Sequence, residues 1–279
     1  MQVEFSLATA GYCLAGQHHA LRGTSRKEIR FYATFGIIRH PRHGVILFDT
    51  GYTQRFYEQT ARFPANIYAA ITKVHIRPEE EAKEVLRRQG ITAEEVRYII
   101  ISHFHADHIG GLRDFPNARF ICAENAYRHY LKSEGILAFR KGYLYNLLPA
   151  DFARRVDFIE FENKGAKHPQ LDRTVDYFGD GSILFCRLEG HARGQIGAIL
   201  NTAAEPVFLI ADACWLRETY RNNHLPHPVV RVFFDSWSAF KNSIRKVRAF
   251  HAAFPQATVI PCHCEATYRN SEYKIEPLS

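Results

Sequence analysis

The chain gathers metal-binding side chains in one short segment, residues 102–111. The segment reads Ser-His-Phe-His-Ala-Asp-His-Ile-Gly-Gly and holds four of them: His103, His105, Asp107 and His108. Successive side chains of an extended chain point to opposite sides, so His103 and His105 can face the same ion. Asp107 and His108 can then reach a second ion beside it. Two neighbouring cations that activate one water molecule are a means of hydrolysis, so this spacing indicates a metal-dependent hydrolase.

Further candidate ligands stand at the ends of other predicted strands. They are His191 after the apolar run 183–188, Asp212 after 206–211, and His263 after 257–262. A two-metal site needs more ligands than one loop supplies, and these three residues complete a set of seven. The alternative interpretation is a histidine-rich surface loop, in a chain that contains 15 His among 279 residues.

This order of motifs resembles the metallo-β-lactamase superfamily, whose pattern is His-x-His-x-Asp-His followed by a His, an Asp and a His at later strand ends. The resemblance runs from about residue 30 to 265 and fills all seven ligand positions. It implies an α/β fold, an αββα sandwich of two mixed β-sheets flanked by helices, with metals at the edge between the sheets. It also implies the ligand sets, which are His103, His105 and His191 for one ion, Asp107, His108 and His263 for the other, and Asp212 between them.

The donor set is imidazole and carboxylate, which suits Zn²⁺ and would also accept Fe, Mn or Co. The resemblance implies two divalent ions that share a hydroxide, which attacks an ester or lactone carbonyl, with Asp107 and Asp212 as catalytic carboxylates. Asp49, in the turn Asp49-Thr50-Gly51, is predicted to support the ligands from behind; the alternative is a simple strand-end turn. Cys262 and Cys264 flank His263 and are expected to point away from it as packing residues.

Within the superfamily, the histidine segment and Glu189-Gly190-His191 are most similar to the N-acyl homoserine lactone hydrolases. Two positions depart from that branch. Trp215 stands where those enzymes carry a Tyr, and Arg193 follows His191 in a turn that usually reads His-Thr-Pro-Gly-His, which would present a charge to an acidic substrate. Lactone or other carboxylic ester hydrolysis is the first expectation. The alternatives are a thioesterase, a phosphodiesterase, and a metal-binding relative without turnover, the last suggested by Trp215.

Composition and charge indicate the number of domains, the cellular location and the kind of partner. A chain of 279 residues with 46% hydrophobic residues can form one domain, 1–279. Six Cys without regular spacing and no signal sequence indicate a cytoplasmic protein, and no stretch of about 20 apolar residues predicts a membrane span. The net charge of +7 is scattered, and its densest cluster, 241–248, follows helical spacing, so no nucleic-acid partner is expected. The expected partner is a small-molecule ester or lactone, and an oligomer is possible.

The order of apolar runs predicts alternating strands and helices. Three hairpins are expected, formed by 36–39 with 45–48, by 174–178 with 183–188, and by 197–201 with 207–210. A long helix is expected from Asp235 to about Phe254. The segment 132–175, with a helix over 143–148, is interpreted as a cap insertion that selects the substrate; alternatively, its aromatic residues fill a satellite core.

Overall fold

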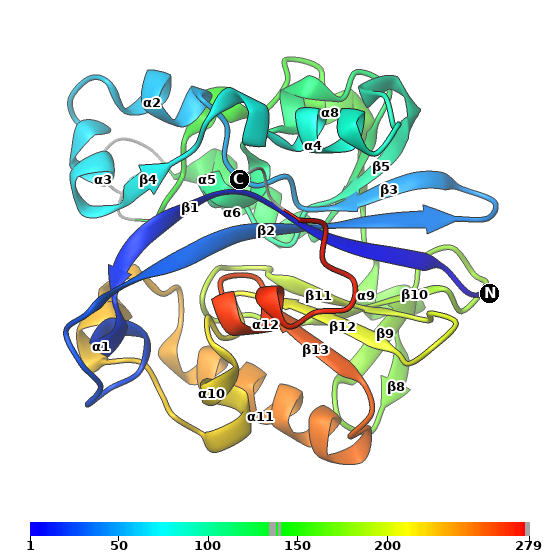
Figure 1. The fold of residues 1–279 in the computed structure, drawn as a ribbon. Helices are drawn as coiled ribbons and strands as arrows, with labels where there is room; N and C mark the ends of the chain where they lie inside the picture. The colour runs from blue at the N-terminus through cyan, green and yellow to red at the C-terminus, as the bar shows by residue number, and fades with distance from the viewer. Residues whose placement is uncertain (134–137, 139–140, 277–279) are drawn as a thin grey trace.

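The computed structural model describes residues 1–133, 138 and 141–276, and within them the chain forms two β-sheets that pack face to face (Figure 1). The first sheet has the order β4 (Lys73–His75), β1 (Glu4–Gly16), β2 (Glu28–His40), β3 (Gly44–Phe48), β5 (Val96–Ile100), β6 (Arg119–Cys122) and β7 (Val156–Phe158). The second has the order β13 (Thr258–Pro261), β12 (Val207–Ala211), β11 (Ile196–Leu200), β10 (Ile183–Arg187), β9 (Asp172–Asp176) and β8 (Ala166–His168).

Both sheets are mixed. In the first, β3, β5, β6 and β7 run parallel to one another, whereas β1, β2 and β3 pair antiparallel. In the second, only β12 and β13 pair in parallel among the described strands. Parallel strands bring their carboxyl ends to the same edge, which is where loops that carry functional side chains collect.

The apolar core lies between the sheets. β11 and β12 are buried at every position, as expected for strands covered on both faces. At Gly36 of β2 the sheets approach so closely that an added Cβ would lie 3.3 Å from Phe48 and 3.5 Å from Leu209 of the facing sheet. The apolar runs noted in the sequence are therefore the two inner faces of a sandwich.

Helices cover the outer faces (Figure 1). Those on the side of the first sheet are α2 (Arg55–Thr60), α3 (Asn66–Ile71), α4 (Ala82–Arg88), α5 (Ala106–Ile109), α6 (Glu124–Lys132) and α8 (Phe152–Arg155). Those below the second sheet are α10 (Arg217–Asn222) and α11 (Trp237–Ala253). The remaining described short helices are α1 (Gln17–Ala20), α9 (Phe161–Lys164) and α12 (Glu265–Arg269), with the 3₁₀ segments η1 (Pro78–Glu80), η2 (Ala93–Glu95), η3 (Leu112–Asp114), η4 (Tyr145–Leu147) and η5 (Pro228–Phe233). This architecture confirms the predicted αββα sandwich.

Helix α11 shows how the sequence specifies this layering. Phe240, Ile244, Val247 and Phe250 recur at helical spacing and pack against the second sheet in one apolar cluster. The Ser236 side chain accepts a hydrogen bond from the backbone N–H of Ala239 and caps the first turn. No helix within the described ranges combines the length and the apolar character needed to cross a membrane.

The three predicted hairpins and the long helix are confirmed, but the helix predicted over 143–148 is wrong. The chain there makes only the turn η4, because Leu144 and Leu148 on either side of it have extended backbones. Of the segment 132–175, residues 134–137 and 139–140 lie outside the described residues. Its described remainder supplies edge strands to both sheets, β7 and β8, and buries Tyr143 in the main core.

Candidate metal centre

The histidine segment changes from strand to helix within a few residues. β5 ends at Ile100, and His105, whose backbone is extended (φ −71°, ψ 156°), directly precedes α5. The rings of His103 and His105 lie 4.4 Å apart between centroids, before the helix begins. Asp107 and His108 lie on its first turn and are buried. The four candidate ligands therefore come from one loop and the helix that continues it.

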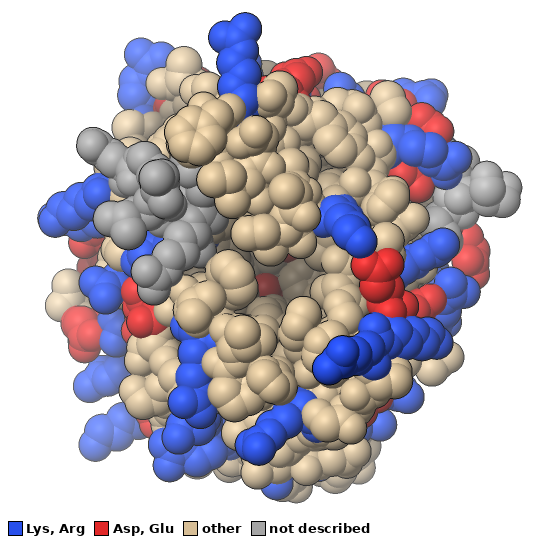
Figure 2. Space-filling model, turned by 90° about the vertical axis from the view of Figure 1, so that its left-hand side faces the viewer, with Lys and Arg blue, Asp and Glu red and all other residues tan. Residues whose placement is uncertain are grey.

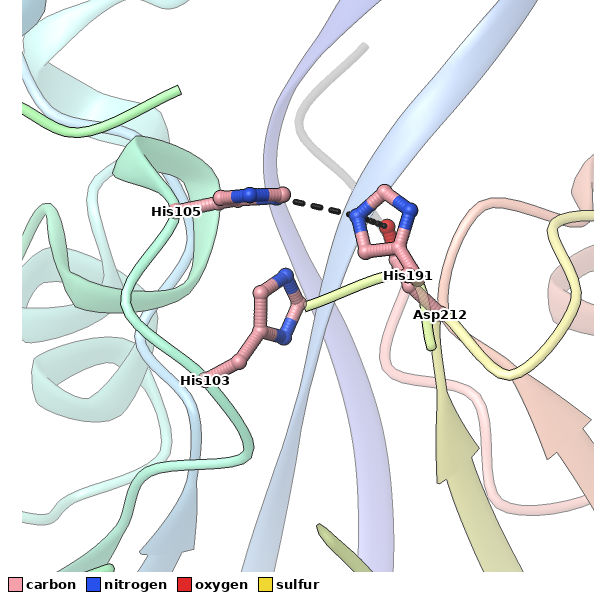
Figure 3. A group of neighbouring side chains, drawn as sticks. All are labelled: His103, His105, His191 and Asp212. Atoms are coloured by element: carbon pink, nitrogen blue, oxygen red, sulfur yellow. Dashed lines mark hydrogen bonds and ion pairs between the residues drawn. The ribbon is translucent and has the colours of Figure 1, made fainter. Parts of the chain in front are cut away.

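The other three candidate ligands come from the second sheet. His191 lies in the loop between β10 and β11, Asp212 directly follows β12, and His263 lies two residues beyond β13. In Figure 3, His103 and His105 approach the centre from one side, and His191 and Asp212 approach it from the other. The centre thus lies where the loops of the two sheets meet.

The distances show that Asp212 joins two groups of side chains. Its Oδ2 atom is 3.1 Å from His191 Nε2 and 3.1 Å from His263 Nε2. Its Oδ1 atom is 3.6 Å from His108 Nε2. Ligand atoms of His103, His105, His191 and Asp212 all lie within 4.8 Å of one another, and those of His108, Asp212, Cys262 and His263 do so as well.

Asp107 falls in neither of these groups but lies beside the second, and within the first His105 contacts His191. Asp107 Oδ2 lies 3.5 Å from His108 Nε2 and 3.5 Å from His263 Nε2. His105 Nδ1 lies 2.9 Å from His191 Nε2. All seven residues singled out in the sequence are therefore neighbours in space, although they come from four separate segments of the chain.

The chemistry of these side chains fits divalent metal ions. The Nε2 atoms of His103 and His108 are buried and have no hydrogen-bond partner among the described residues. Burial, followed by the neighbouring His108, holds the pKa of His103 well below its usual value, so its ring is neutral and offers a lone pair. A buried imidazole nitrogen without a partner is costly unless a ligand satisfies it.

Asp49 contacts His108 through Nδ1, the ring nitrogen other than the candidate ligand atom Nε2. Asp49 Oδ2 accepts hydrogen bonds from His108 Nδ1 at 2.7 Å and from the Ser102 hydroxyl at 2.8 Å, and Oδ1 accepts from the Ser102 backbone N–H at 2.8 Å. Burial alone would lower the pKa of His108, but Asp107 and Asp49 outweigh burial and raise it to about 10. Asp49 therefore contacts a candidate ligand, as the predicted supporting role requires, and that role stays a prediction. The backbone carbonyl of Tyr32 accepts a hydrogen bond from His263 Nδ1 at 2.8 Å and so orients that ring.

The residues around these pairs explain the Thr-Gly and Gly-Gly motifs. The Thr50 hydroxyl donates to the His108 carbonyl at 3.0 Å and accepts from the Gly111 N–H at 3.0 Å. Gly51 has φ +66°, and a Cβ there would lie 2.4 Å from the Cβ of Ala10. At Gly110 a Cβ would lie 2.5 Å from the Gly51 carbonyl oxygen. The glycines let the two loops touch, which places His108 against Asp49.

The family model of the metallo-beta-lactamase superfamily matches residues 30–263. The chain belongs to the metallo-beta-lactamase superfamily. An N-acyl homoserine lactonase AttM of Rhizobium johnstonii is 28% identical over 193 residues, which cover 67% of this chain and 65% of that protein. The AttM lactonase of Azorhizobium caulinodans is 26% identical over 196 residues, which cover 69% of this chain and 68% of that protein. The chain thus spans about two thirds of the length of these relatives.

Solved structures share the fold. An N-acyl homoserine lactone hydrolase with the product N-hexanoyl-L-homoserine at its catalytic metal centre superposes with a TM-score of 0.74 at 18% identity, over 98% of both chains. A variant of B. thuringiensis AiiA with N-decanoyl-L-homoserine bound gives a TM-score of 0.72 at 17% identity, also over 98% of both chains. The family and the likeness to its lactonase branch, both predicted from the sequence, are confirmed.

Trp215 and Arg193, the two departures from the lactonase branch, each have a carboxylate partner. Trp215 has no hydroxyl, but its indole Nε1–H donates to Asp212 Oδ2 at 3.2 Å. Arg193 is half exposed, and its Nε lies 3.3 Å from Asp235 Oδ2, so its charge is paired within the protein. Trp215 therefore contacts a residue of the candidate metal centre, and Arg193 contacts a neighbouring carboxylate.

The orientation predicted for Cys262 is wrong. Its thiol donates to Asp212 Oδ1 at 2.5 Å, on the same side as His263. β13 ends at Pro261, so Cys262 lies in a turn where the alternation of a strand no longer applies. Burial, followed by Asp212, raises the pKa of this thiol well above its usual value. Cys264, by contrast, packs in an apolar cluster beside Leu216, as expected.

Aromatic rings stand around the centre. Phe234 and Trp215 lie 5.1 and 5.8 Å from His191, Phe31 lies 5.5 Å from His263, and Tyr143 lies 5.8 Å from His105, all between ring centroids. The face of the molecule in Figure 2 is hollowed near its middle, with uncharged side chains around the hollow and an acidic one visible in its depth. Such surroundings suit a ligand with a substantial apolar part.

Proposed function

We propose that the chain is a hydrolase that uses two divalent metal ions to open lactones or to cleave other carboxylic esters. The single observation that carries the proposal is the position of Asp212, whose carboxylate faces His191 and His263 at 3.1 Å each. A carboxylate between two groups of imidazoles is an arrangement that suits a pair of metal ions.

The ligands follow from the same geometry. His103, His105 and His191 would hold one ion, Asp107, His108 and His263 the other, and Asp212 would contact both. Zn²⁺ is the ion that this nitrogen and oxygen set suits first. When bound, the ions supply Lewis acidity that polarises a carbonyl oxygen and lowers the pKa of a water molecule. Asp107 and Asp212 are the two carboxylates in contact with the reacting centre.

The substrate's acyl part would lie against aromatic residues. Trp215 and Phe234 stack on one another at 5.5 Å and flank His191. On the other side, Gly142 packs against the His105 ring, where an added Cβ would lie 3.1 Å from Cδ2, and the adjacent Tyr143 faces the same ring. These contacts support a substrate-selecting role for the segment 132–175.

Two cations near the site share one carboxylate. Asp235 Oδ2 lies 3.3 Å from Arg193 Nε and Asp235 Oδ1 lies 3.7 Å from Lys141 Nζ, so one carboxylate contacts both cations. All six cysteines are free, which supports a reducing, cytoplasmic setting.

A panel assay tests the proposal. Protein loaded with Zn²⁺ would be offered N-acyl homoserine lactones of varied chain length, acyl thioesters and bis-aryl phosphodiesters. We expect turnover of lactones or esters, its loss in His105→Ala, and its loss on chelation of the metal. Inert lactones and esters beside active phosphodiesters would overturn the ester assignment, and no turnover of any substrate with two ions bound would indicate a binding protein.

A further inference from the structure

We propose that Cys262 is an additional ligand of this metal centre and gives the ion between His108 and His263 a sulfur donor. The inference rests on the proposed metal centre and adds one residue to it. Cys262 Sγ lies 2.5 Å from Asp212 Oδ1. It also lies within 4.8 Å of ligand atoms of His108 and His263.

A second observation points to a ligand at the same place. His108 belongs to this group, and its Nε2 atom is buried and has no hydrogen-bond partner within the described part of the chain. The sulfur and this nitrogen both lie beside Asp212 Oδ1, at 2.5 and 3.6 Å from it. An ion placed among them would satisfy the nitrogen and would separate the thiol from the carboxylate.

Hydrogen bonds hold the backbone of Cys262 in place. The carbonyl of Cys262 accepts a hydrogen bond from the Thr34 hydroxyl at 2.7 Å, and the buried Thr34 belongs to β2 of the facing sheet. The Cys262 N–H donates to the Ala211 carbonyl at 3.4 Å, beside Asp212. The position of the sulfur next to Asp212 is thus built by both sheets.

Packing does not account for this cysteine. Cys122, Cys186, Cys214 and Cys264 are members of apolar clusters. Cys262 is 5% exposed but belongs to none of the clusters that the described residues form. It is also the only cysteine, among the residues described, that falls in a group of candidate metal ligands.

The Cys262 thiol would bind the ion as a thiolate. As the sulfur–metal bond forms, the thiol loses its proton to solvent, because a thiolate is the form that binds metal. Two ligand atoms on one tetrahedral ion lie about 3.5 Å apart, so binding would part Sγ from Oδ1. A thiolate is a soft donor, and it favours Zn²⁺ and Cd²⁺ over Mn²⁺.

Substitution with Co²⁺ tests the inference without an activity assay. The full chain would be loaded with Co²⁺, the bound ions counted by equilibrium dialysis, and the near-ultraviolet absorption recorded. We expect a sulfur-to-cobalt charge-transfer band in the wild type and in the control Cys264→Ser, and its loss in Cys262→Ser. We also expect Cys262→Ser to weaken Cd²⁺ binding at least about tenfold while Mn²⁺ binding changes little.

The outcomes separate this inference from the proposed function. If the wild type binds no ion, the metal centre itself is wrong. If it binds two ions without the charge-transfer band, or if the band persists in Cys262→Ser, only the role of Cys262 is overturned. Should Cys262→Ser not fold, X-ray absorption of the zinc-loaded wild type decides, because a sulfur neighbour at about 2.3 Å is required and its absence overturns the inference.

Discussion

His108 Nδ1 donates to Asp49 Oδ2 at 2.7 Å, in a pair whose side chains are 2% and 1% exposed. The two residues are 59 positions apart: Asp49 directly follows β3, and His108 lies in α5, beyond the parallel strand β5. This bond fixes the ring of His108 so that Nε2 faces Asp212. The Ser102 hydroxyl donates a second hydrogen bond to Asp49 Oδ2. The orientation of a metal ligand is thereby set by a residue that would touch no metal.

Asp49→Asn should weaken zinc binding roughly 10- to 100-fold, because the amide no longer accepts a charge-assisted hydrogen bond from His108. Competition with a chromogenic chelator measures the change. The matched control is Asp114→Asn, which removes a carboxylate paired with Arg55 outside the candidate ligand groups. Equal zinc affinities for Asp49→Asn and the wild type would show that the pair does not orient the ligand.

Gly51→Ala should destabilise the protein more than Gly90→Ala does. Both glycines have positive φ, +66° and +71°, so each alanine costs about 1 to 2 kcal/mol of backbone strain. At Gly51 the new Cβ would meet the Cβ of Ala10 at 2.4 Å, whereas nothing lies within 4 Å at Gly90. The clash should add about 1 to 3 kcal/mol at Gly51 only.

Urea unfolding of both variants measures the difference in the free energy of unfolding. Zinc affinity should fall in Gly51→Ala as well, because the displaced turn carries Asp49. Indistinguishable stabilities of the two variants would mean that Ala10 yields to the added methyl group.

The sequence was sufficient to place the seven candidate ligands together. The histidine segment is local, and His191, Asp212 and His263 each follow an apolar run that becomes a buried strand, so the sheet itself brings them to one edge. The side to which the Cys262 side chain points could not be predicted from the sequence pattern. It depends on β13 ending at Pro261, and strand ends shift with tertiary context by more than the one residue that decides which side a side chain faces.

Two other features were not predicted correctly from the sequence: the backbone over 143–148 and the contact of Trp215 with Asp212. The apolar spacing over 143–148 suits a helix, but Leu144 and Tyr143 are buried in the main core by an irregular segment after Gly142, whose φ is +71°. Tertiary burial there outweighs local periodicity. The contact of Trp215 with Asp212 was missed because the comparison with the lactonase Tyr considered only a hydroxyl, whereas an indole N–H is also a donor.

Trp215→Phe should weaken metal binding about tenfold, because it removes a hydrogen bond to the carboxylate that faces both groups of ligands. Trp237→Phe is the matched control, since the chain has only two Trp and Trp237 packs on Phe240 and Phe234. Isothermal titration of Zn²⁺ into the metal-free variants measures both affinities. A loss of the same size in both variants would assign the effect to aromatic packing.

Acid should destabilise the wild type partly through His40. His40 Nδ1 accepts hydrogen bonds from the backbone N–H groups of Arg42 and His43, so the ring must be neutral, with its proton on Nε2 facing Ser182 and Asp180. Burial outweighs the attraction of Asp180 and lowers the pKa of His40 below its usual 6.5. The unfolded chain therefore binds a proton that the folded chain resists, so this contribution is present above about pH 6.5 and is lost as the pH falls towards the lower pKa of the folded state.

His40→Gln tests this account, because the glutamine oxygen can still accept from one backbone N–H but the side chain cannot titrate. Free energies of unfolding would be measured for the metal-free proteins between pH 8 and pH 5, the range that brackets the usual histidine pKa of about 6.5. The variant should be the less stable protein at pH 8, since it loses hydrogen bonds, and its stability should fall less steeply on acidification. Parallel pH profiles would show that the acid sensitivity resides in other groups, of which the buried His103 and His105, with pKa values well below the usual one, are the first to substitute next.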